Sequence, residues 1–304
     1  DLSVSRGLGD VYKRQDGYTA SYDPLPSPSC LTSAVFEATS GERLALMKNV
    51  IHQSVIALVA CLALASTATA NPPQVFDYVA KETRAIDRDH FTQGLLIWDE
   101  TLWVSSGLYG ESFVARYEWP SMASRKITKL PDQYFAEGIA ELNGRIYVLT
   151  WRSQDLLVLD PDSMEIIETH PLLGEGWGVT SDGSQLWISD GTHRLAVWED
   201  GEVKQTIEVT YDGKRVSRLN ELEWIDGEIW ANVWLTDQIV RIDPTSGIIT
   251  SIIDLRGLLP RGERRRDTDV LNGIAVDPKT GAVWLGGKRW PSLFNVELIE
   301  RITQ

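Results

Sequence analysis

One segment of about fifteen residues recurs five times along this 304-residue chain, and its spacing constrains the fold more than any other feature. Each copy opens with a polar or aromatic residue, usually followed by glycine, and continues with an apolar run, a tight turn and a second apolar run that carries Trp or Tyr. The copies begin 40 to 52 residues apart, at Gln93, Glu137, Trp177, Asn220 and Asn272. A period of this length that is rich in short strands is typical of a β-propeller, in which each repeat forms one four-stranded blade around a channel.

Each copy predicts a β-hairpin, because its centre holds residues that tolerate or preset the backbone angles of tight turns. The five turns are Asp99-Glu100, Asn143-Gly144, Asp182-Gly183, Asp226-Gly227 and residues 277–281. After Lys288 the chain has room for one more strand, over about 293–302, so the fifth blade lacks a strand. We expect segment 74–86, which precedes the first hairpin, to join the last blade and close the ring. The sequence therefore predicts an all-β fold, a five-bladed β-propeller, and leaves an open sandwich of irregular hairpins as the alternative.

Three segments divide the chain. Residues 71–304 contain all five repeats and predict one propeller domain that carries the chemistry. Residues 47–70 have the layout of a secretory signal peptide, with a basic start after Met47, an apolar core over 55–65 and small residues up to a cleavage point after Ala70. Residues 1–46 show no periodicity, so we expect a non-native or unstructured upstream segment. This interpretation predicts export to the periplasm or out of the cell.

Composition narrows the choice of partners and cofactors. The net charge of −14 argues against nucleic acid or an anionic membrane surface as a partner. Both cysteines, Cys30 and Cys61, precede the predicted cleavage point, and the four His residues show no pair at ligand spacing, so we predict no disulfide in the mature protein and no catalytic metal site built on Cys or His, and leave open a structural cation in the channel. Cys61 is an alternative lipoprotein attachment site, but the apolar run continues beyond it. The apolar core of the signal is too short to span a membrane, and we expect a monomer.

The ends of the five repeats are where chemistry is expected. In a hairpin, the first residue of one strand lies beside the last residue of the other, so five hairpins around one axis gather ten such positions at one mouth of the channel. These positions are Gln93, Gly107, Glu137, Trp151, Trp177, Gly191, Asn220, Trp234, Asn272 and Lys288. Aromatic walls with a few convergent polar groups are the usual form of a small-ligand site.

Structural roles compete with functional ones at these positions. Glu137 could be a buried acid satisfied by backbone amides, Lys288 a solvated loop lysine, and Trp177 a core residue. Trp177 is flanked by glycines and has no local side chain to pack against, which favours a wall of a ligand site. For Asn272 we favour a role in turning the backbone.

Short motifs at these positions closely resemble, in order, those of the plant and bacterial type of glutaminyl-peptide cyclotransferase, a five-bladed propeller enzyme. The resemblance extends from about Phe76 to Glu297, and its motifs are HFTQG at 90–94, YFAEG at 134–138, LTW at 149–151, GWG at 176–178, LNELE at 219–223, NVW at 232–234, DVLNGIA at 269–275 and GKRWP at 287–291. It implies that Glu137 transfers protons and that Asn220 and Lys288 bind or polarise the reacting amide. The implied pocket residues are Phe91, Gln93, Phe135, Trp151, Trp177 and Trp234.

The reaction implied by this resemblance is closure of the N-terminal glutamine of a peptide or protein to pyroglutamate, with release of ammonia. It needs no cofactor, because nucleophile and electrophile belong to one residue. Two other functions stay open. One is a secreted propeller that only binds a peptide or sugar at the channel mouth. The other is a metal-dependent lactonase of propeller form, which needs several carboxylates around a cation, whereas Glu137 is the one carboxylate among the ten mouth positions.

Overall fold

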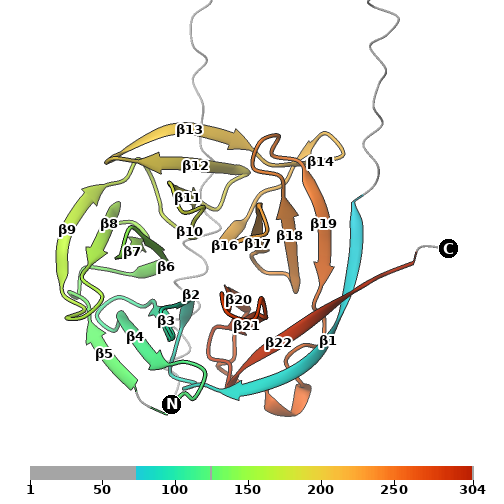
Figure 1. Cartoon of the computed structure of the whole chain (residues 1–304), viewed down its shortest axis with the longest axis horizontal. Coiled ribbons are helices and arrows are strands. Elements are labelled where there is room, and N and C mark those ends of the chain that lie inside the picture. Colours follow the sequence, from blue (N-terminus) through green and yellow to red (C-terminus); the bar gives the residue numbers. More distant parts are fainter. Residues whose placement is uncertain (1–72, 124, 303–304) are drawn as a thin grey trace, which may run out of the picture. The chain divides into compact units, whose positions relative to one another are not determined.

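The computed structural model describes residues 73–302 apart from residue 124, so the predicted segments 1–46 and 47–70 lie outside the described residues. Within the described part, the regular structure consists of β-strands and one short 3-10 helix, η1 (Arg261–Glu263). No helix in this part of the chain is long and apolar enough to cross a membrane. The strands form five blades arranged as a ring around a channel (Figure 1), which confirms the predicted five-bladed β-propeller.

The blades follow one another along the chain, and in each the first strand is innermost in the ring (Figure 1). Blade 1 contains β2 (Thr92–Trp98), β3 (Thr101–Ser106), β4 (Phe113–Glu118) and β5 (Arg125–Lys129). Blade 2 contains β6 (Ala136–Leu142), β7 (Arg145–Thr150), β8 (Asp155–Leu159) and β9 (Ile166–Pro171). Blade 3 contains β10 (Val179–Ser181), β11 (Leu186–Ser189), β12 (Arg194–Glu199) and β13 (Glu202–Glu208), and a small hairpin of β14 (Thr210–Tyr211) and β15 (Lys214–Arg215) follows it. Blade 4 contains β16 (Leu219–Ile225), β17 (Glu228–Val233), β18 (Gln238–Ile242) and β19 (Ile249–Asp254). Blade 5 contains β20 (Leu271–Val276), β21 (Val283–Gly287), β22 (Ser292–Glu300) and β1 (Gln74–Ala85).

The five predicted hairpins are the inner strand pairs of the five blades. Their turns use the left-handed backbone region that Asn, Asp and Gly tolerate best. In the turn between β6 and β7, φ is 53° at Asn143 and 73° at Gly144, and between β16 and β17 it is 51° at Asp226 and 83° at Gly227. Local turn chemistry therefore sets the position of each inner hairpin.

Strand β1 closes the ring, as the sequence predicts. It pairs antiparallel with β22 from Phe76 opposite Glu300 to Ala85 opposite Ser292, and parallel with β19 over Gln74–Phe76. β1 thus completes blade 5 and joins it to blade 4 in one eight-stranded sheet (Figure 1). This pairing covers sheet edges that would otherwise template aggregation.

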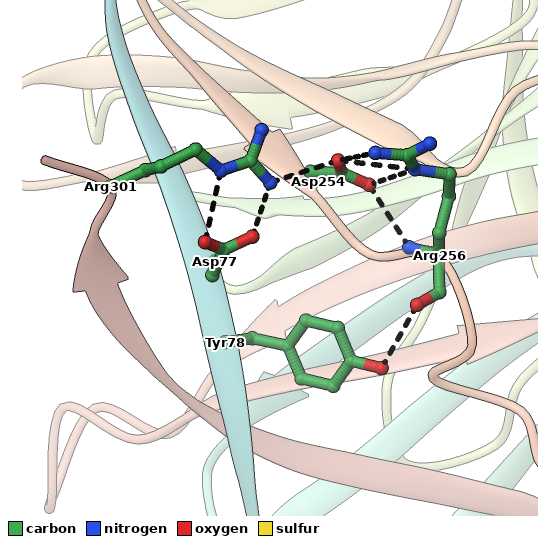
Figure 2. A pocket seen from close by; sticks show the side chains of 5 residues that line it. All are labelled: Asp77, Tyr78, Asp254, Arg256 and Arg301. Carbon is green, nitrogen blue, oxygen red and sulfur yellow. Dashed lines mark hydrogen bonds and ion pairs between the residues drawn. The ribbon is translucent and has the colours of Figure 1, made fainter. Parts of the chain in front are cut away.

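A cluster of charged residues lies at this closure (Figure 2). The Arg301 guanidinium donates hydrogen bonds to Asp77 on β1 and to Asp254 at the end of β19, the latter at 3.0 Å. Arg256 donates to the same Asp254 carboxylate at 2.6 Å. These hydrogen bonds hold the pKa of Asp254 below its usual range. The cluster therefore links the C-terminal residues to β1 and to blade 4.

The hydrophobic core consists of apolar clusters at the junctions between neighbouring blades, each made by two adjacent blades. Between blades 3 and 4, for example, Leu195 packs with Leu222 and Ile229, and all three are fully buried. Burying an aliphatic side chain of this size stabilises the fold by about 1.5 to 3 kcal/mol. Tryptophans such as Trp103, between blades 1 and 2, and Trp284, between blades 5 and 1, extend these clusters. Blade packing therefore stabilises the ring.

Candidate active site

The ten predicted mouth positions lie at equivalent ends of the inner hairpins. In blades 1, 2, 4 and 5, the N–H of the residue that follows the second inner strand donates to a carbonyl just before the first inner strand. This is seen for Trp151 to Phe135 at 3.0 Å, for Trp234 to Arg218 at 2.8 Å and for Lys288 to Val270 at 2.9 Å. Gly107 donates to Phe91 in the same way in blade 1. The hairpin ends of these blades are therefore closed in the same way, and ring contacts between Phe91 and Phe135 and between Trp177 and Trp234 bring the ends of neighbouring blades together.

In four blades, a shift in strand register takes the first residue of the repeat out of the regular pairing between the two inner strands. The pairing of the two inner strands is interrupted at Gln93 in blade 1, at Glu137 in blade 2, at Asn220 in blade 4 and at Asn272 in blade 5. Such bulges redirect a side chain out of the regular alternation of a strand. The residues that open four of the repeats are thereby freed from strand pairing at the mouth.

Close approach between blades explains the glycine that usually comes second in the repeat. A Cβ atom added to Gly94 would lie 2.6 Å from the backbone nitrogen of Ile139 in blade 2. At Gly178 it would lie 1.9 Å from the carbonyl oxygen of Asn220 in blade 4. Because no side chain fits at these distances, the glycines allow the inner strands of neighbouring blades to pack closely around the channel.

The predicted acid and amine of the site are both buried. Glu137 and Lys288 are each 3 % exposed. Burial raises the pKa of Glu137 well above its usual range, against the opposing effect of Lys288. Burial lowers the pKa of Lys288, against the opposing effect of Glu137. Among the described residues, neither side chain takes part in an ion pair within 4.0 Å, so the two groups influence each other electrostatically without direct contact.

Three predicted amide residues of the mouth have buried side-chain oxygens without a hydrogen-bond partner in the described part of the chain, and one of them also makes structural hydrogen bonds. The side-chain oxygens of Gln93 and Asn220 are buried and have no hydrogen-bond partner among the described residues. A buried acceptor without a partner costs about 1 to 3 kcal/mol, and a ligand donor recovers that cost. The side-chain oxygen of Asn272 likewise has no described partner, but its Nδ2 donates to the carbonyls of Thr92 and Gln93 at 3.2 and 3.1 Å. This agrees with the backbone role favoured for Asn272.

The predicted aromatic residues form two groups of edge-to-face rings. Phe135 lies 6.4 Å from Phe91 and 5.5 Å from Trp151 between ring centroids, and Trp177 lies 5.6 Å from Trp234. The Lys288 ammonium lies 5.0 Å from the Phe91 ring centroid, a favourable cation–π distance. All six predicted pocket residues are buried, and five of them supply these rings.

The two glycines among the mouth positions make room for these rings. A Cβ atom on Gly107 would lie 2.3 Å from the Phe135 ring, and one on Gly191 would lie 2.6 Å from the Trp177 ring. Because these two glycines have no side chain, the Phe135 and Trp177 rings can pack directly against the backbone at the mouth.

Two residues of the mouth are not found from the repeat, because both lie in loops between strands. Glu175 accepts hydrogen bonds from the indole nitrogens of Trp151 at 2.7 Å and Trp177 at 3.1 Å. Tyr109 is 47 % exposed, and its ring lies 5.4 Å from Phe135 and 6.3 Å from Trp151. The position of Glu175 two residues before Trp177 is the only sequence signal that points to it.

The channel behind the mouth holds two further buried carboxyl groups, both on β16. Glu221 accepts hydrogen bonds from the backbone nitrogens of Leu95 in blade 1 at 3.2 Å and Ile274 in blade 5 at 2.9 Å. Glu223 accepts from the backbone nitrogen of Val276 at 2.9 Å, and burial raises its pKa to about 8. These carboxyl groups connect blade 4 to other blades. Across the described residues, no three His, Cys, Asp or Glu side chains are grouped as metal ligands.

Comparison with known proteins agrees with this fold. The family model described as glutamine cyclotransferase matches residues 53–298. The chain belongs to the glutamine cyclotransferase family. A glutaminyl-peptide cyclotransferase from Arabidopsis thaliana is 38 % identical over 220 residues, which cover 70 % of this chain and 68 % of that protein. The resemblance found in the sequence motifs is thereby confirmed.

A solved structure supports the fold of this chain. The crystal structure of Myxococcus xanthus glutaminyl cyclase superposes with a TM-score of 0.68 at 29 % sequence identity, over 76 % of this chain and 100 % of that one. The comparisons identify the family and the fold. The individual roles of Glu137, Asn220 and Lys288 stay predictions.

Proposed function

We propose that the protein converts the N-terminal glutamine of peptides and proteins to pyroglutamate and releases ammonia. Family membership supports the reaction class. The observation that carries the proposal is the burial of Glu137 and Lys288 at one mouth, where each affects the pKa of the other. A carboxyl group and an amine that share an aromatic-walled site can move a proton and stabilise negative charge without bulk water.

In the first step, the α-amine of the substrate attacks the carbon of its own γ-carboxamide. A free α-amine titrates near pH 7.7 to 8.0, so a substantial minority is neutral at pH 7. The unpartnered oxygens of Gln93 and Asn220 can accept N–H groups of this amine or of the amide. As the new C–N bond forms, the Glu137 carboxylate takes the proton that the amine loses.

In the second step, the tetrahedral intermediate collapses. Its negative oxygen is stabilised by the Lys288 ammonium or by the Asn220 amide, and loss of one such donor typically costs roughly 2.7 to 4 kcal/mol. Glu137 returns its proton to the departing nitrogen, the original C–N bond breaks and ammonia leaves. A raised pKa suits a carboxyl group that acts first as base and then as acid.

The aromatic rings would hold the glutamine side chain folded back on its own amine. Trp151, Trp177, Trp234 and the two phenylalanines are each at most 8 % exposed, so they also limit access of water that could hydrolyse the amide. No step of this mechanism needs a metal ion. We further propose that the enzyme acts after export, because residues 47–70 have the layout of a signal peptide.

Ammonia release from a Gln-Gly peptide, measured with the purified protein in the presence and absence of a chelator, tests the proposal. We expect ammonia and a pyroglutamyl product that mass spectrometry identifies, with a rate that the chelator leaves unchanged. Binding of the peptide without ammonia release would instead indicate a propeller that only binds. Loss of activity with chelator would contradict the metal-free mechanism.

A further inference from the structure

One carboxylate oxygen joins two walls of the site. Glu175 lies in the connection between β9 and β10, and its Oε2 accepts from Trp151 Nε1 at 2.7 Å and from Trp177 Nε1 at 3.1 Å. Trp151 follows the inner hairpin of blade 2, and Trp177 precedes that of blade 3. The shared acceptor therefore fixes the orientation of two indole rings that belong to different blades.

Packing alone does not explain this arrangement. The indole nitrogens of four buried tryptophans between blades have no hydrogen-bond partner among the described residues; these are Trp103, Trp198, Trp230 and Trp284. The fold thus tolerates buried indole N–H groups without acceptors where tryptophan only fills space. At the mouth, by contrast, two indoles converge on one carboxylate whose side chain is 33 % exposed.

A cation on the other side of Glu175 supports the carboxylate. Arg152 Nε lies 3.4 Å from Glu175 Oε1, and the Arg152 guanidinium lies 4.1 Å from the centroid of the Trp151 ring. Glu137 therefore has three charged groups in its surroundings, Lys288, Glu175 and Arg152. Lys288 lowers the pKa of Glu137, Glu175 raises it, and Arg152 lies against Glu175.

We propose that Glu175 is a positioning residue, which holds the Trp151 and Trp177 rings as fixed walls around the folded-back glutamine of the substrate. This proposal rests on the proposed cyclisation. Without the shared acceptor, both rings gain freedom to rotate, and fewer bound substrates have the amine next to the amide carbon. Misplacement of a reacting group by about 1 Å can cost about a hundredfold in rate.

Two substitutions separate the hydrogen bonds from the charge. Glu175→Leu removes both, whereas Glu175→Gln keeps an oxygen that can accept an indole hydrogen bond and removes only the charge. For Gln-Gly peptide we expect kcat/KM to fall about a hundredfold in Glu175→Leu, mainly through kcat, and to stay within about fivefold in Glu175→Gln. Glu168→Leu, on β9, the outer strand of blade 2, with a side chain 61 % exposed, is the control and should keep the parent rate.

A second measurement does not depend on turnover. In ¹⁵N-labelled protein, we expect the indole signals of Trp151 and Trp177 to shift and broaden in Glu175→Leu but to persist in Glu175→Gln. In the Gln variant, ¹³C NMR of the Glu137 carboxyl should show a lower pKa than in the parent protein, because a nearby negative charge is gone.

The outcomes separate the two proposals. A parent protein that releases no ammonia overturns the cyclisation, while the indole signals still report whether Glu175 holds the rings. An active parent with an equally active Glu175→Leu variant, or unchanged indole signals in that variant, overturns the positioning role. Loss of activity in Glu175→Leu in proportion to loss of folded protein would also overturn it.

Discussion

Glu137 at the mouth and Glu221 in the channel occupy neighbouring positions of the repeat in two blades: Glu137 is the first residue of its repeat, and Glu221 is the second residue of its own. Both lie on an innermost strand where the register shifts, both are at most 3 % exposed, and burial raises the pKa of both. Glu221 accepts two backbone hydrogen bonds from blades 1 and 5, whereas the Glu137 carboxyl accepts none among the described residues. The channel carboxyl group is thus used for structure, and the mouth carboxyl group is left available for chemistry.

The largest expected effect comes from removal of the acid at the mouth. Glu137→Gln should lower kcat by about a hundredfold to ten-thousandfold, the usual contribution of general acid–base catalysis. Thermal unfolding should stay close to that of the parent, because no described hydrogen bond depends on this carboxyl group. Ammonia release and a melting curve on the same sample provide the check, and unaltered turnover would remove Glu137 from the mechanism.

Substitution of the oxyanion donors should have the next largest effect. Loss of the residue that stabilises the oxyanion costs roughly 2.7 to 4 kcal/mol in the barrier, which corresponds to a kcat lowered by about a hundredfold to a thousandfold. We expect Lys288→Met to show this loss and Asn220→Ala to raise KM more than it lowers kcat. The reverse pattern in steady-state kinetics would give the oxyanion role to Asn220.

The channel carboxyl group should give the opposite result. Glu221→Ala leaves the backbone nitrogens of Leu95 and Ile274 without their acceptor, so the free energy of unfolding should fall by about 1 to 3 kcal/mol. Glu221→Gln, which keeps one acceptor oxygen, should lose less. Urea denaturation measures both, and turnover per folded molecule should stay at the parent value. If Glu221→Ala lost turnover without losing stability, Glu221 would act in catalysis as Glu137 is proposed to do, and the contrast between the two carboxyl groups would be wrong.

Glu223 should make stability depend on pH. Its pKa is about 8 in the folded protein, above the usual value for glutamate, so the folded state binds the proton more tightly than the unfolded state. Its contribution to stability therefore falls as pH rises from about 4.5 to about 8, by at most about 1.4 kcal/mol per pH unit. The difference between the parent and Glu223→Gln in urea denaturation should shrink with rising pH, and a difference independent of pH would contradict this.

The charged cluster at the ring closure should show the smallest effect. Arg301 pairs with Asp77 and Asp254, but its side chain is 38 % exposed, so solvent screens the interaction (Figure 2). Arg301→Ala should therefore leave the midpoint of urea denaturation close to that of the parent, with unchanged turnover. A large fall in that midpoint would mean that ring closure depends on this cluster and not on pairing between β1 and β22.

Much of the fold could be predicted because a hairpin is a local structure. Asn143-Gly144 and Asp226-Gly227 encode their turns within two residues, and each turn aligns the two strands beside it. Repetition of the hairpin then gave the number of blades, the missing strand and the ten mouth positions. Seven of the nine predicted site residues follow from the same register, since they lie at hairpin ends, whereas Phe91 and Phe135 were implied only by the resemblance to the family.

The sequence by itself determined the five hairpins, because each depends on neighbours along the chain. The number and spacing of the hairpins then indicated the strand that closes the ring and the residues at the hairpin ends. The tertiary structure decided what each buried polar group does there. Glu137 has no described hydrogen bond to its carboxyl, Glu221 holds two blades, and Glu175 holds two tryptophans. These contacts join different blades and loops, so they depend on how blades pack and not on any local pattern.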